Sequence, residues 1–300
     1  MILLAVSGGI DSMYMAYKAI EQSRDFAVAH CNFTLREEES DGDERFVQDW
    51  CLEHGVRFFS RRFDTSAYAA EHGISIEMAA RELRYGWFAE LCQEKGFDAV
   101  AVAHNANDNA ETLMLNLLRG TGSRGLRGMG AVSDREEGLT ILRPLLSITR
   151  EEIKTWMLEN GHGWREDRTN AMSEYKRNKI RNEVFPVFAQ INPSFIQTLN
   201  RDMEHFTEAD SIVEDYFLEC LSGLDCGEKL ENGLSIPRLM ALKHWKYILW
   251  RILEPYRLSR ETFDKLTALL ESGRTVSGKV FQSPTHLIEI HKKRIYASPR

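Results

Sequence analysis

The stretch Ser7-Gly8-Gly9-Ile10-Asp11-Ser12, which directly follows the apolar run Ile2-Leu3-Leu4-Ala5-Val6, decides the fold class that this sequence predicts. It predicts a strand that turns through two glycines into a helix. Glycine adopts positive φ without a Cβ clash, and the unpaired N–H groups at a helix start favour an anion. The serine hydroxyls add donors, and Asp11 can hold a metal ion. The stretch predicts a phosphate site, although an ordinary capped turn uses the same residue types.

Two other phosphate-binding loops do not fit this stretch. A Walker A loop requires Gly-Lys-Ser or Gly-Lys-Thr, which does not follow here, and a dinucleotide fingerprint needs a third glycine in place of Ser12. The six residues spell Ser-Gly-Gly-x-Asp-Ser, which is similar to the loop of the ATP pyrophosphatases.

Composition limits the class of protein. The 300 residues suffice for a catalytic domain and a smaller one, and the net charge is −7. No apolar stretch approaches the ~18 residues of a membrane span, and the chain begins with a core strand, so we expect a cytoplasmic protein without membrane contact. The five cysteines show no Cys-x-x-Cys spacing, which argues against a disulfide scaffold, a zinc ribbon or an iron–sulfur cluster.

One segment departs from the acidic average. Between Arg119 and Asn182, thirteen Lys and Arg stand against nine Asp and Glu. Such a basic segment predicts an RNA contact or, equally, a solvated face of mixed charge.

Apolar runs alternate with helical patterns in the first hundred residues. The runs are Ile2–Val6, Phe26–His30, Val56–Phe59 and Ala99–Ala103. This order predicts a parallel sheet between layers of helices. Because ligands of such sheets bind beyond the carboxyl ends of the strands, we expect Ser7, His30 and His104 to converge on one crevice.

The later part of the chain is predicted to be mainly helical. Thr149 and Glu152 form a capping box for a helix that Gly161 ends. We expect a catalytic domain over 1–192, a helical linker over 193–232 and a mainly helical C-terminal domain over 233–300 that contacts RNA. The elements expected in this part are helices over Ser194 to about Leu224, Pro237–Glu254 and Arg260–Glu271, and strand character over Val280–Ser283 and Leu287–Ala297.

A second polar constellation follows the strand that ends near Ala103. Asp108 is expected to cap the next helix, with Glu111 three residues later. The helical period puts Asp108, Thr112 and Arg119 on one face, which can look into the crevice. The opposite stripe is expected to be buried, and it comprises Ala110, Leu113, Met114, Leu117 and Leu118. A capping box without further function explains the local pattern nearly as well.

Two helices carry paired arginines. Arg81 and Arg84, in a helix over about 76–95, suit phosphate or RNA, or an ion pair with Glu77. Arg177 and Arg181 align at i and i+4, where like charges repel unless an anion lies between them. A triphosphate or an RNA backbone would serve, with Asn178 available for directional hydrogen bonds.

In order along about residues 1 to 190, these motifs resemble the tRNA(Ile)-lysidine synthase family of PP-loop ATP pyrophosphatases. The matching motifs are Ser7–Ser12, His30–Arg36, Ala80–Tyr85, His104–Thr112 with Leu118–Gly122, Gly125–Met129, Arg143–Leu146 and Arg177–Arg181. The resemblance implies an α/β fold with a parallel, five-stranded, Rossmann-like sheet flanked by helices. It also implies ATP-dependent ligation of L-lysine to carbon 2 of the wobble cytidine of tRNA(Ile), through an adenylated tRNA, with release of pyrophosphate and AMP.

The resemblance assigns roles residue by residue. It implies ATP binding by Ser7, Gly8, Gly9, Ile10, Asp11, Ser12, His30, Thr112, Arg119 and Gly122. It implies Mg²⁺ binding by Asp11 and Asp108, and catalysis by Asp11, Asp108, His104 as a proton shuttle and Arg181. It implies tRNA binding by Arg36, Arg81, Arg84, Arg177, Asn178 and Arg181.

Two departures from the family pattern stand out. Asn107-Asp108-Asn109 occupies the place where the family commonly has paired aspartates and Gln, so one metal-binding carboxylate is missing. The chain also ends at Arg300, where many relatives continue into a further tRNA-binding module, which indicates a short form or a truncated one.

Other functions stay open beside this one. A PP-loop tRNA thiolase shares the loop but normally uses paired cysteines or a cluster. A non-catalytic ATP-binding sensor would not need the arginine-rich residues 175–182. The oligomeric state, including a homodimer, is left open.

Overall fold

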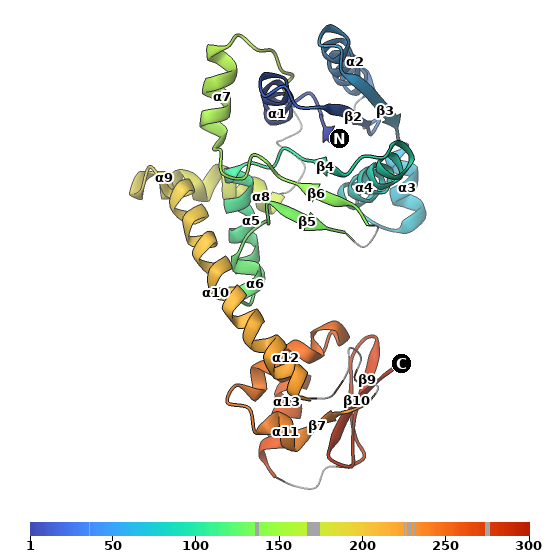
Figure 1. The fold of residues 1–300 in the computed structure, drawn as a ribbon, viewed down its shortest axis with the longest axis vertical. Coiled ribbons are helices and arrows are strands. Elements are labelled where there is room, and N and C mark those ends of the chain that lie inside the picture. The colour runs from blue at the N-terminus through green and yellow to red at the C-terminus, as the bar shows by residue number, and fades with distance from the viewer. Residues whose placement is uncertain are drawn as a thin grey trace. The chain divides into compact units, whose positions relative to one another are not determined.

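The computed structural model describes residues 1–35, 37–135, 138–166, 175–224, 226, 230, 232–273 and 277–300. It divides into two compact units, Met1–Thr207 and Glu208–Arg300 (Figure 1). This division falls inside the helix α10 (Phe195–Leu224). The expected boundaries at 192 and 232 stay a prediction.

The first unit is an α/β sandwich. Its strands are β1 (Ile2–Ala5), β2 (Phe26–Asn32), β3 (Arg57–Arg62), β4 (Ala99–Ala101), β5 (Val132–Asp134) and β6 (Thr140–Leu142). Its helical elements are α1 (Ile10–Glu21), α2 (Glu37–Glu53), α3 (Thr65–His72), α4 (Ile76–Lys95), α5 (Ala106–Arg119), α6 (Ser123–Leu126), α7 (Arg150–Glu159), α8 (Tyr175–Lys179), the π-helical turn η2 (Ile180–Val184) and α9 (Phe185–Ile191).

The sheet has six strands in the order β3-β2-β1-β4-β6-β5. The first five are parallel, and β5 pairs with β6 antiparallel. The expectation of a purely parallel five-stranded sheet is therefore wrong in strand number and at one edge. Neither β5 nor β6 is among the four apolar runs that predict strands. Each has only three residues, and Val132 of β5 is exposed, so both lack a long apolar run.

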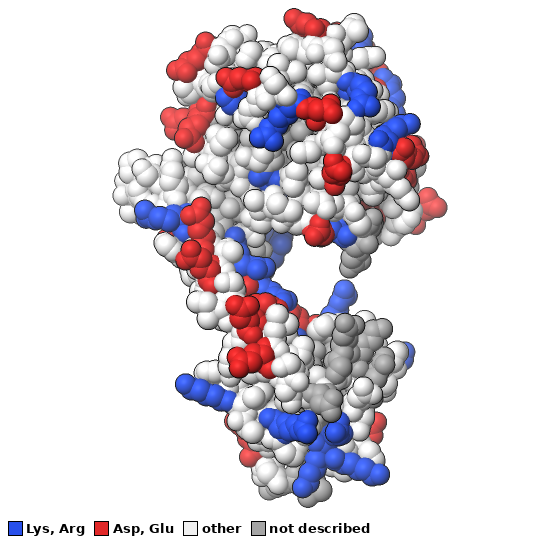
Figure 2. Space-filling model, in the orientation of Figure 1, with Lys and Arg blue, Asp and Glu red and all other residues white. Residues whose placement is uncertain are grey.

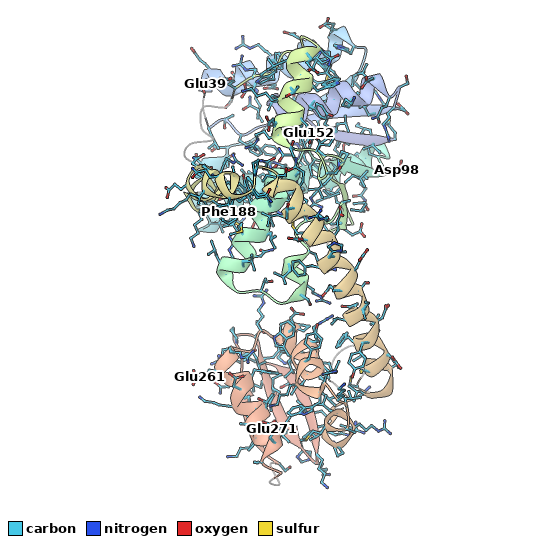
Figure 3. All side chains as sticks on the ribbon, turned by 90° about the vertical axis from the view of Figure 1, so that its left-hand side faces the viewer. Glu39, Asp98, Glu152, Phe188, Glu261 and Glu271 are labelled. Carbon is cyan, nitrogen blue, oxygen red and sulfur yellow. The ribbon has the colours of Figure 1, made fainter. Side chains whose placement is uncertain are left out.

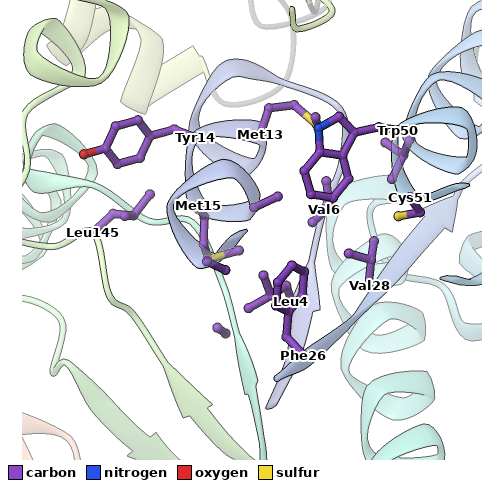
Figure 4. Packing of buried hydrophobic residues seen from close by; sticks show 14 of the residues in the cluster. Leu4, Val6, Met13, Tyr14, Met15, Phe26, Val28, Trp50, Cys51 and Leu145 are labelled. Atoms are coloured by element: carbon purple, nitrogen blue, oxygen red, sulfur yellow. The ribbon is translucent and has the colours of Figure 1, made fainter. Parts of the chain in front are cut away.

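Both faces of the sheet are buried, as the continuous apolar runs predict. Leu4 of β1 and Val6, which follows the strand, pack with α1, α2 and α7 through residues such as Met13 and Trp50 (Figure 4). Leu3 points to the other face, which α4 covers. Because successive side chains of a strand alternate, β1 joins the two cores and holds the loop after it between them.

Local signals set the start of α7. The Thr149 side chain accepts the N–H of Glu152 at 3.2 Å, and the Glu152 carboxylate accepts the N–H of Thr149 at 2.7 Å. Figure 3 labels Glu152 at this helix start. The predicted capping box is confirmed.

The second unit contains a four-stranded sheet in what was predicted to be a mainly helical domain. The strand character expected over Val280–Ser283 and Leu287–Ala297 is confirmed. The strands β7 (Leu234–Ser235), β8 (Lys279–Gln282), β9 (His286–His291) and β10 (Arg294–Pro299) pair antiparallel in the order β7-β10-β9-β8. The expected strand over Leu287–Ala297 is two strands, because Lys292 and Lys293 both have positive φ and form a tight turn. Lysine is not a typical residue of such turns, so the turn is not predictable from these residue types.

The helices of this unit pack on its sheet. They are α11 (Ile236–Met240), α12 (Trp245–Leu253), the 3₁₀ turn η3 (Glu254–Tyr256) and α13 (Arg260–Glu271). The single helix expected over Pro237–Glu254 is thus interrupted after Met240. Ile288 and Ile290 of β9 contribute to one core with Leu224, Leu249 and other apolar residues.

The surface charges on one face of the first unit are mixed, and the described helices are not strongly apolar. On the face of the first unit that Figure 2 shows, Lys and Arg are interspersed with Asp and Glu. Within the described part of the chain, no helix combines the length and the hydropathy that a bilayer-spanning segment needs.

Candidate functional site

A cleft of about 670 Å³ opens at the carboxyl ends of β1, β2 and β4. Its lining includes Ser7, Gly9, Ile10, Asp11 and Ser12 of the loop, Cys31 and Phe33 after β2, His104 after β4, Arg84, Tyr85 and Phe88 of α4, Arg150 and Lys154 of α7, and Trp164-Arg165-Glu166. The expected convergence of strand ends on one crevice is confirmed for Ser7 and His104.

The loop between β1 and α1 is held by its own serines and by one distant residue. Gly8 has a φ of +94°, which an L side chain rarely adopts, whereas Gly9 has an ordinary φ of −72°. Ser12 Oγ accepts the N–H of Ser7 at 3.1 Å and donates to the carbonyl of Gly9 at 2.9 Å. The N–H of Arg165 donates to the carbonyl of Gly8 at 2.9 Å. The first N–H groups of α1, which have no intrahelical acceptors, thereby border the cleft.

The carboxylates of Asp11 and Asp108 are close enough to repel each other at the start of α5. Asp11 Oδ1 accepts an N–H of the Asn105 side chain at 3.0 Å. Burial raises the pKa of Asp11, the guanidinium of Arg150 opposes this shift, and the Asp108 carboxylate adds to it. An additional positive charge would therefore stabilise this pair.

The cap of α5 differs from the expectation. Asn105, not Asp108, caps the helix, because Asn105 Oδ1 accepts the N–H groups of Asn107 and Asp108 at 3.0 Å. Asp108 lies at the third helical position, and its Oδ2 accepts the N–H of Asn105 at 3.1 Å. The predicted buried stripe is also wrong at its end, since Leu117 and Leu118 are exposed.

The pair Asp11 and Asp108 fits a magnesium ion. Mg²⁺ prefers oxygen ligands and is commonly held by one or two carboxylates together with substrate phosphates. Over the described ranges, no group of three or more His, Cys, Asp or Glu could hold a metal ion by itself. The missing carboxylate is accounted for by Asn107, whose Oδ1 accepts the backbone N–H of Arg150 at 3.0 Å.

Glu111 is the anion between Arg177 and Arg181. The Glu111 side chain is fully buried, and its carboxylate accepts two hydrogen bonds from Arg181, at 2.7 and 2.9 Å. Arg177 Nε lies 3.6 Å from the same carboxylate. Arg181 also comes within 3.5 Å of Asp108. The sequence argument considered only a triphosphate or RNA at this place, and the structure adds a carboxylate of the chain itself.

The two histidines have different environments. His30 is buried, and its Nδ1 lies 2.9 Å from the carbonyl of Val6, so its ring does not line the cleft. His104 lines the cleft, and its Nδ1 has no hydrogen-bond partner among the described residues. Burial lowers the pKa of His104 to about 4, against the opposing field of Asp108. His104 is therefore a neutral imidazole at pH 7.

The arginines of α4 contact aromatic rings. Arg84 lies over Phe33 at 5.2 Å, and Arg81 and Arg135 lie over Tyr85 at 5.2 and 4.4 Å. In the part of the chain that the structure describes, neither Arg81 nor Arg84 forms an ion pair, so the alternative of a pair with Glu77 is not observed. Arg84 faces the cleft.

The other predicted site residues lie away from the cleft lining. Thr112 donates to the carbonyl of Asp108 at 2.9 Å and lies 3.4 Å from Arg177. Arg119 and Gly122 are exposed near the end of α5, and Asn178 is half-buried in α8. Arg36 lies outside the described residues.

One wall of the cleft, which α7 and the residues after it contribute, was not predicted from the sequence. Arg150 and Lys154 line the cleft, as do Trp164, Arg165 and Glu166. The spacing of Arg150 and Lys154, one helical turn apart after a strong capping box, was the available signal. Arg165 also pairs with Asp43.

The fold and the loop define a PP-loop domain. A family profile described as "PP-loop domain" matches residues 1–188, and one described as "TilS substrate binding domain" matches residues 228–300. The U34-tRNA thiolase NcsA from Methanococcus maripaludis shares the fold, with a TM-score of 0.58 and 18% identity over 69% of this chain and 72% of that one.

Curated relatives narrow this class. The tRNA(Ile)-lysidine synthase of Chlorobaculum tepidum is 40% identical over 289 residues, covering 92% of this chain and 85% of the relative. That of Parabacteroides distasonis is 39% identical over 285 residues, covering 95% of this chain and 63% of the relative. The chain belongs to the tRNA(Ile)-lysidine synthase family. It spans about 63% of the length of several of these relatives, including two from Porphyromonas gingivalis.

Proposed function

We propose that this chain ligates L-lysine to carbon 2 of the wobble cytidine of tRNA(Ile) at the expense of ATP. The observation that carries the proposal is the cleft that the loop Ser7–Ser12 lines, with the Asp11 carboxylate in its wall and the Asp108 carboxylate close enough to raise the pKa of Asp11. We infer the substrates that such a cleft would bind from the membership of the chain in the family.

The proposed reaction has two steps. The oxygen on carbon 2 of cytidine attacks the α-phosphate of ATP and pyrophosphate leaves; the ε-amine of lysine then attacks carbon 2 and AMP leaves. The N–H groups of the loop bind phosphate oxygens and orient the triphosphate. Mg²⁺, when bound by Asp11 and Asp108, neutralises charge that develops on the leaving phosphates.

We propose that His104 handles a proton in the second step. The incoming amine must lose protons as it bonds to carbon 2. The ring of His104 lines the cleft and is neutral at pH 7, so it can accept one of them. Phosphate charge in the cleft raises the proton affinity of the ring when substrates are bound.

We propose that RNA reaches the cleft along α4. Arg81 and Arg84 are half-exposed to exposed and form no ion pair among the described residues, so their charges are open to phosphate groups. Arg84 also lies over the ring of Phe33, which lines the cleft and can stack on a base. Arg177, Asn178, Arg181 and Arg36 stay predicted RNA contacts, and the homodimer and the cytoplasmic location stay predictions.

The thiolase alternative has less support in this cleft. Of the five cysteines, all of which the structure describes, Cys31 alone lines the cleft. Burial raises the pKa of its thiol to about 12, so it carries almost no thiolate at pH 7. Sulfur transfer needs a nucleophilic thiolate, which favours an amine as the nucleophile.

Incubation with ATP, radiolabelled lysine and tRNA(Ile) tests the proposal. We expect label in tRNA and release of AMP and pyrophosphate without a sulfur donor. Unlabelled tRNA under conditions in which ATP is bound would leave the sensor function standing. Sulfur in the tRNA after addition of a cysteine desulfurase would favour the thiolase.

Asp11→Asn tests the metal assignment. We expect tRNA-dependent ATP–pyrophosphate exchange to be abolished, because one of two metal ligands is lost. The protein should remain folded, and at pH 7 at least as stable as the wild type, because a raised folded-state pKa means that ionised Asp11 opposes folding above that pKa. Exchange is measured with labelled pyrophosphate, and stability by urea unfolding. Exchange at the wild-type rate would remove Asp11 from the metal site.

A further inference from the structure

The cationic face of α7 has no role in the function described so far. Arg150 and Lys154 lie one turn apart and both line the cleft that contains the loop Ser7–Ser12. They flank a face of α7 that is fixed in the core, since Ile153 and Met157 are fully buried. The helix also packs on α1 through an edge-to-face contact of Trp156 with Tyr14 at 5.1 Å. The two cations are thus held on a rigid element beside the loop.

Neither Arg150 nor Lys154 has a close acidic partner among the described residues. Arg150 lies 3.5 Å from Asp108, a long contact, and no ion pair involves Lys154 among the residues described. Of the other cations that line the cleft, Arg165 pairs with Asp43, and Arg84 lies over Phe33 at 5.2 Å. Arg150 and Lys154 therefore form a side of the cleft that is open to an added anion.

Asn107 fixes the start of this face. Its Oδ1 accepts the N–H of Arg150 at 3.0 Å, while the N–H of Ala106 donates to the carbonyl of Ile148 at 2.9 Å. These bonds join the first turn of α5, which carries Asp108, to the first turn of α7. The amide that replaces a family carboxylate thus sets the position of Arg150 beside the acidic pair.

We propose that Arg150 and Lys154 bind the β- and γ-phosphates of ATP and hold pyrophosphate as it leaves, with Asn107 as the positioning residue for Arg150. The proposal rests on the proposed function. As the nucleophilic oxygen bonds to the α-phosphorus, the bond from that phosphorus to the bridging oxygen breaks, and its electron pair stays on pyrophosphate. Two cations opposite the loop N–H groups and the metal site stabilise that charge where it develops.

Binding of ATP, pyrophosphate and AMP to the full-length chain, measured by calorimetry with Mg²⁺ and without tRNA, tests the proposal. Arg150→Met and Lys154→Met keep the apolar stem and remove the charge. We expect each to weaken ATP and pyrophosphate binding about tenfold, as the loss of one charge-assisted contact does, and AMP binding less than twofold. Lys95→Met, at the exposed end of α4, is the control and should change none of the three.

The positioning role of Asn107 has its own readout. Asn107→Ala should lower the ratio of ATP to AMP affinity, whereas Asn107→Asp, which keeps an acceptor oxygen for the Arg150 N–H, should preserve it. A merely structural role would lower thermal stability in Asn107→Ala and leave that ratio unchanged, which would overturn the positioning role.

The inference and the proposed function fail differently. Wild-type ATP affinity in both Arg150→Met and Lys154→Met would overturn the inference while lysine ligation by the wild type stands. An equal loss of ATP and AMP affinity would also overturn it, since the contact would then not be to the leaving phosphates. A wild-type chain that binds no ATP would overturn both.

Discussion

Two helical segments carry similar arginine pairs and use them differently. Arg81 and Arg84 lie one turn apart on α4, and Arg177 and Arg181 lie one turn apart across α8 and η2. The α4 pair contacts aromatic rings and has no acidic partner among the described residues. The second pair is held by Glu111, and Arg181 also by Asp108.

The difference shows that spacing alone does not distinguish a binding arginine from a structural one. A buried carboxylate such as Glu111 is very unfavourable unless it is paired and hydrogen-bonded, and Arg181 supplies two hydrogen bonds. We infer that the second pair mainly stabilises the site, whereas the first pair is open to a ligand. We therefore favour α4 over the segment of Arg177 and Arg181 as the RNA-binding element.

The largest expected effect is on stability. Glu111→Gln should lower the free energy of unfolding by about 3 kcal/mol, because Arg181 is left half-buried without its anion. Urea unfolding followed by tryptophan fluorescence measures this. Glu90→Gln is the control: its carboxylate pairs with Arg61 at the surface, so about 0.5 kcal/mol or less is expected. Equal effects of the two variants would contradict the assigned difference.

The next effect is on RNA affinity. Arg84→Ala should weaken binding of an anticodon stem-loop about tenfold and reduce the salt dependence by about 0.7 in log Kd per log salt, as for one lost phosphate contact. Its free energy of unfolding should change by less than about 0.5 kcal/mol. Arg181→Ala should show the opposite pattern, with stability lost first. Fluorescence anisotropy at several salt concentrations measures affinity.

Arg177→Ala extends the same comparison. Its Nε lies 3.6 Å from Glu111 and has more exposure than that carboxylate, so we expect a smaller loss of stability than for Arg181→Ala. A loss of RNA affinity in Arg177→Ala at least as large as in Arg84→Ala, with unchanged stability, would restore this segment as the principal RNA contact.

The smallest expected effect is a pH dependence of stability that arises from His104. One arginine of each pair, Arg84 and Arg177, helps to lower the pKa of this histidine. Because burial lowers its folded-state pKa to about 4, the unfolded chain binds more protons between pH 6.5 and 4. Its contribution to stability is therefore complete above pH 6.5 and is lost as the pH falls. At pH 6 we expect wild type to lose about 0.7 kcal/mol more, relative to pH 7, than His104→Asn. Parallel pH profiles for the two proteins would contradict the buried environment.

Much of the first unit followed from local sequence. The strand Ile2–Ala5, the helix Ile76–Lys95 and the capping box of Thr149 and Glu152 were each predictable from apolar runs, helical period or paired cap residues. The C-terminal sheet was underestimated, because its turn at Lys292-Lys293 adopts positive φ in residues that do not signal it. The antiparallel edge β5 was missed because it is short and exposed.

The loop Ser7–Ser12 follows from local residues, because the φ of Gly8 and the serine hydrogen bonds depend on neighbours within a few residues. Which charges neutralise one another depends instead on how distant elements pack. Glu111 meets Arg181 seventy residues away, His30 bonds to Val6 after β1, and Asn107 joins α5 to α7. Such contacts depend on how elements distant in the chain pack. The hydropathy and spacing of residues do not identify the distant residue that a polar side chain will contact.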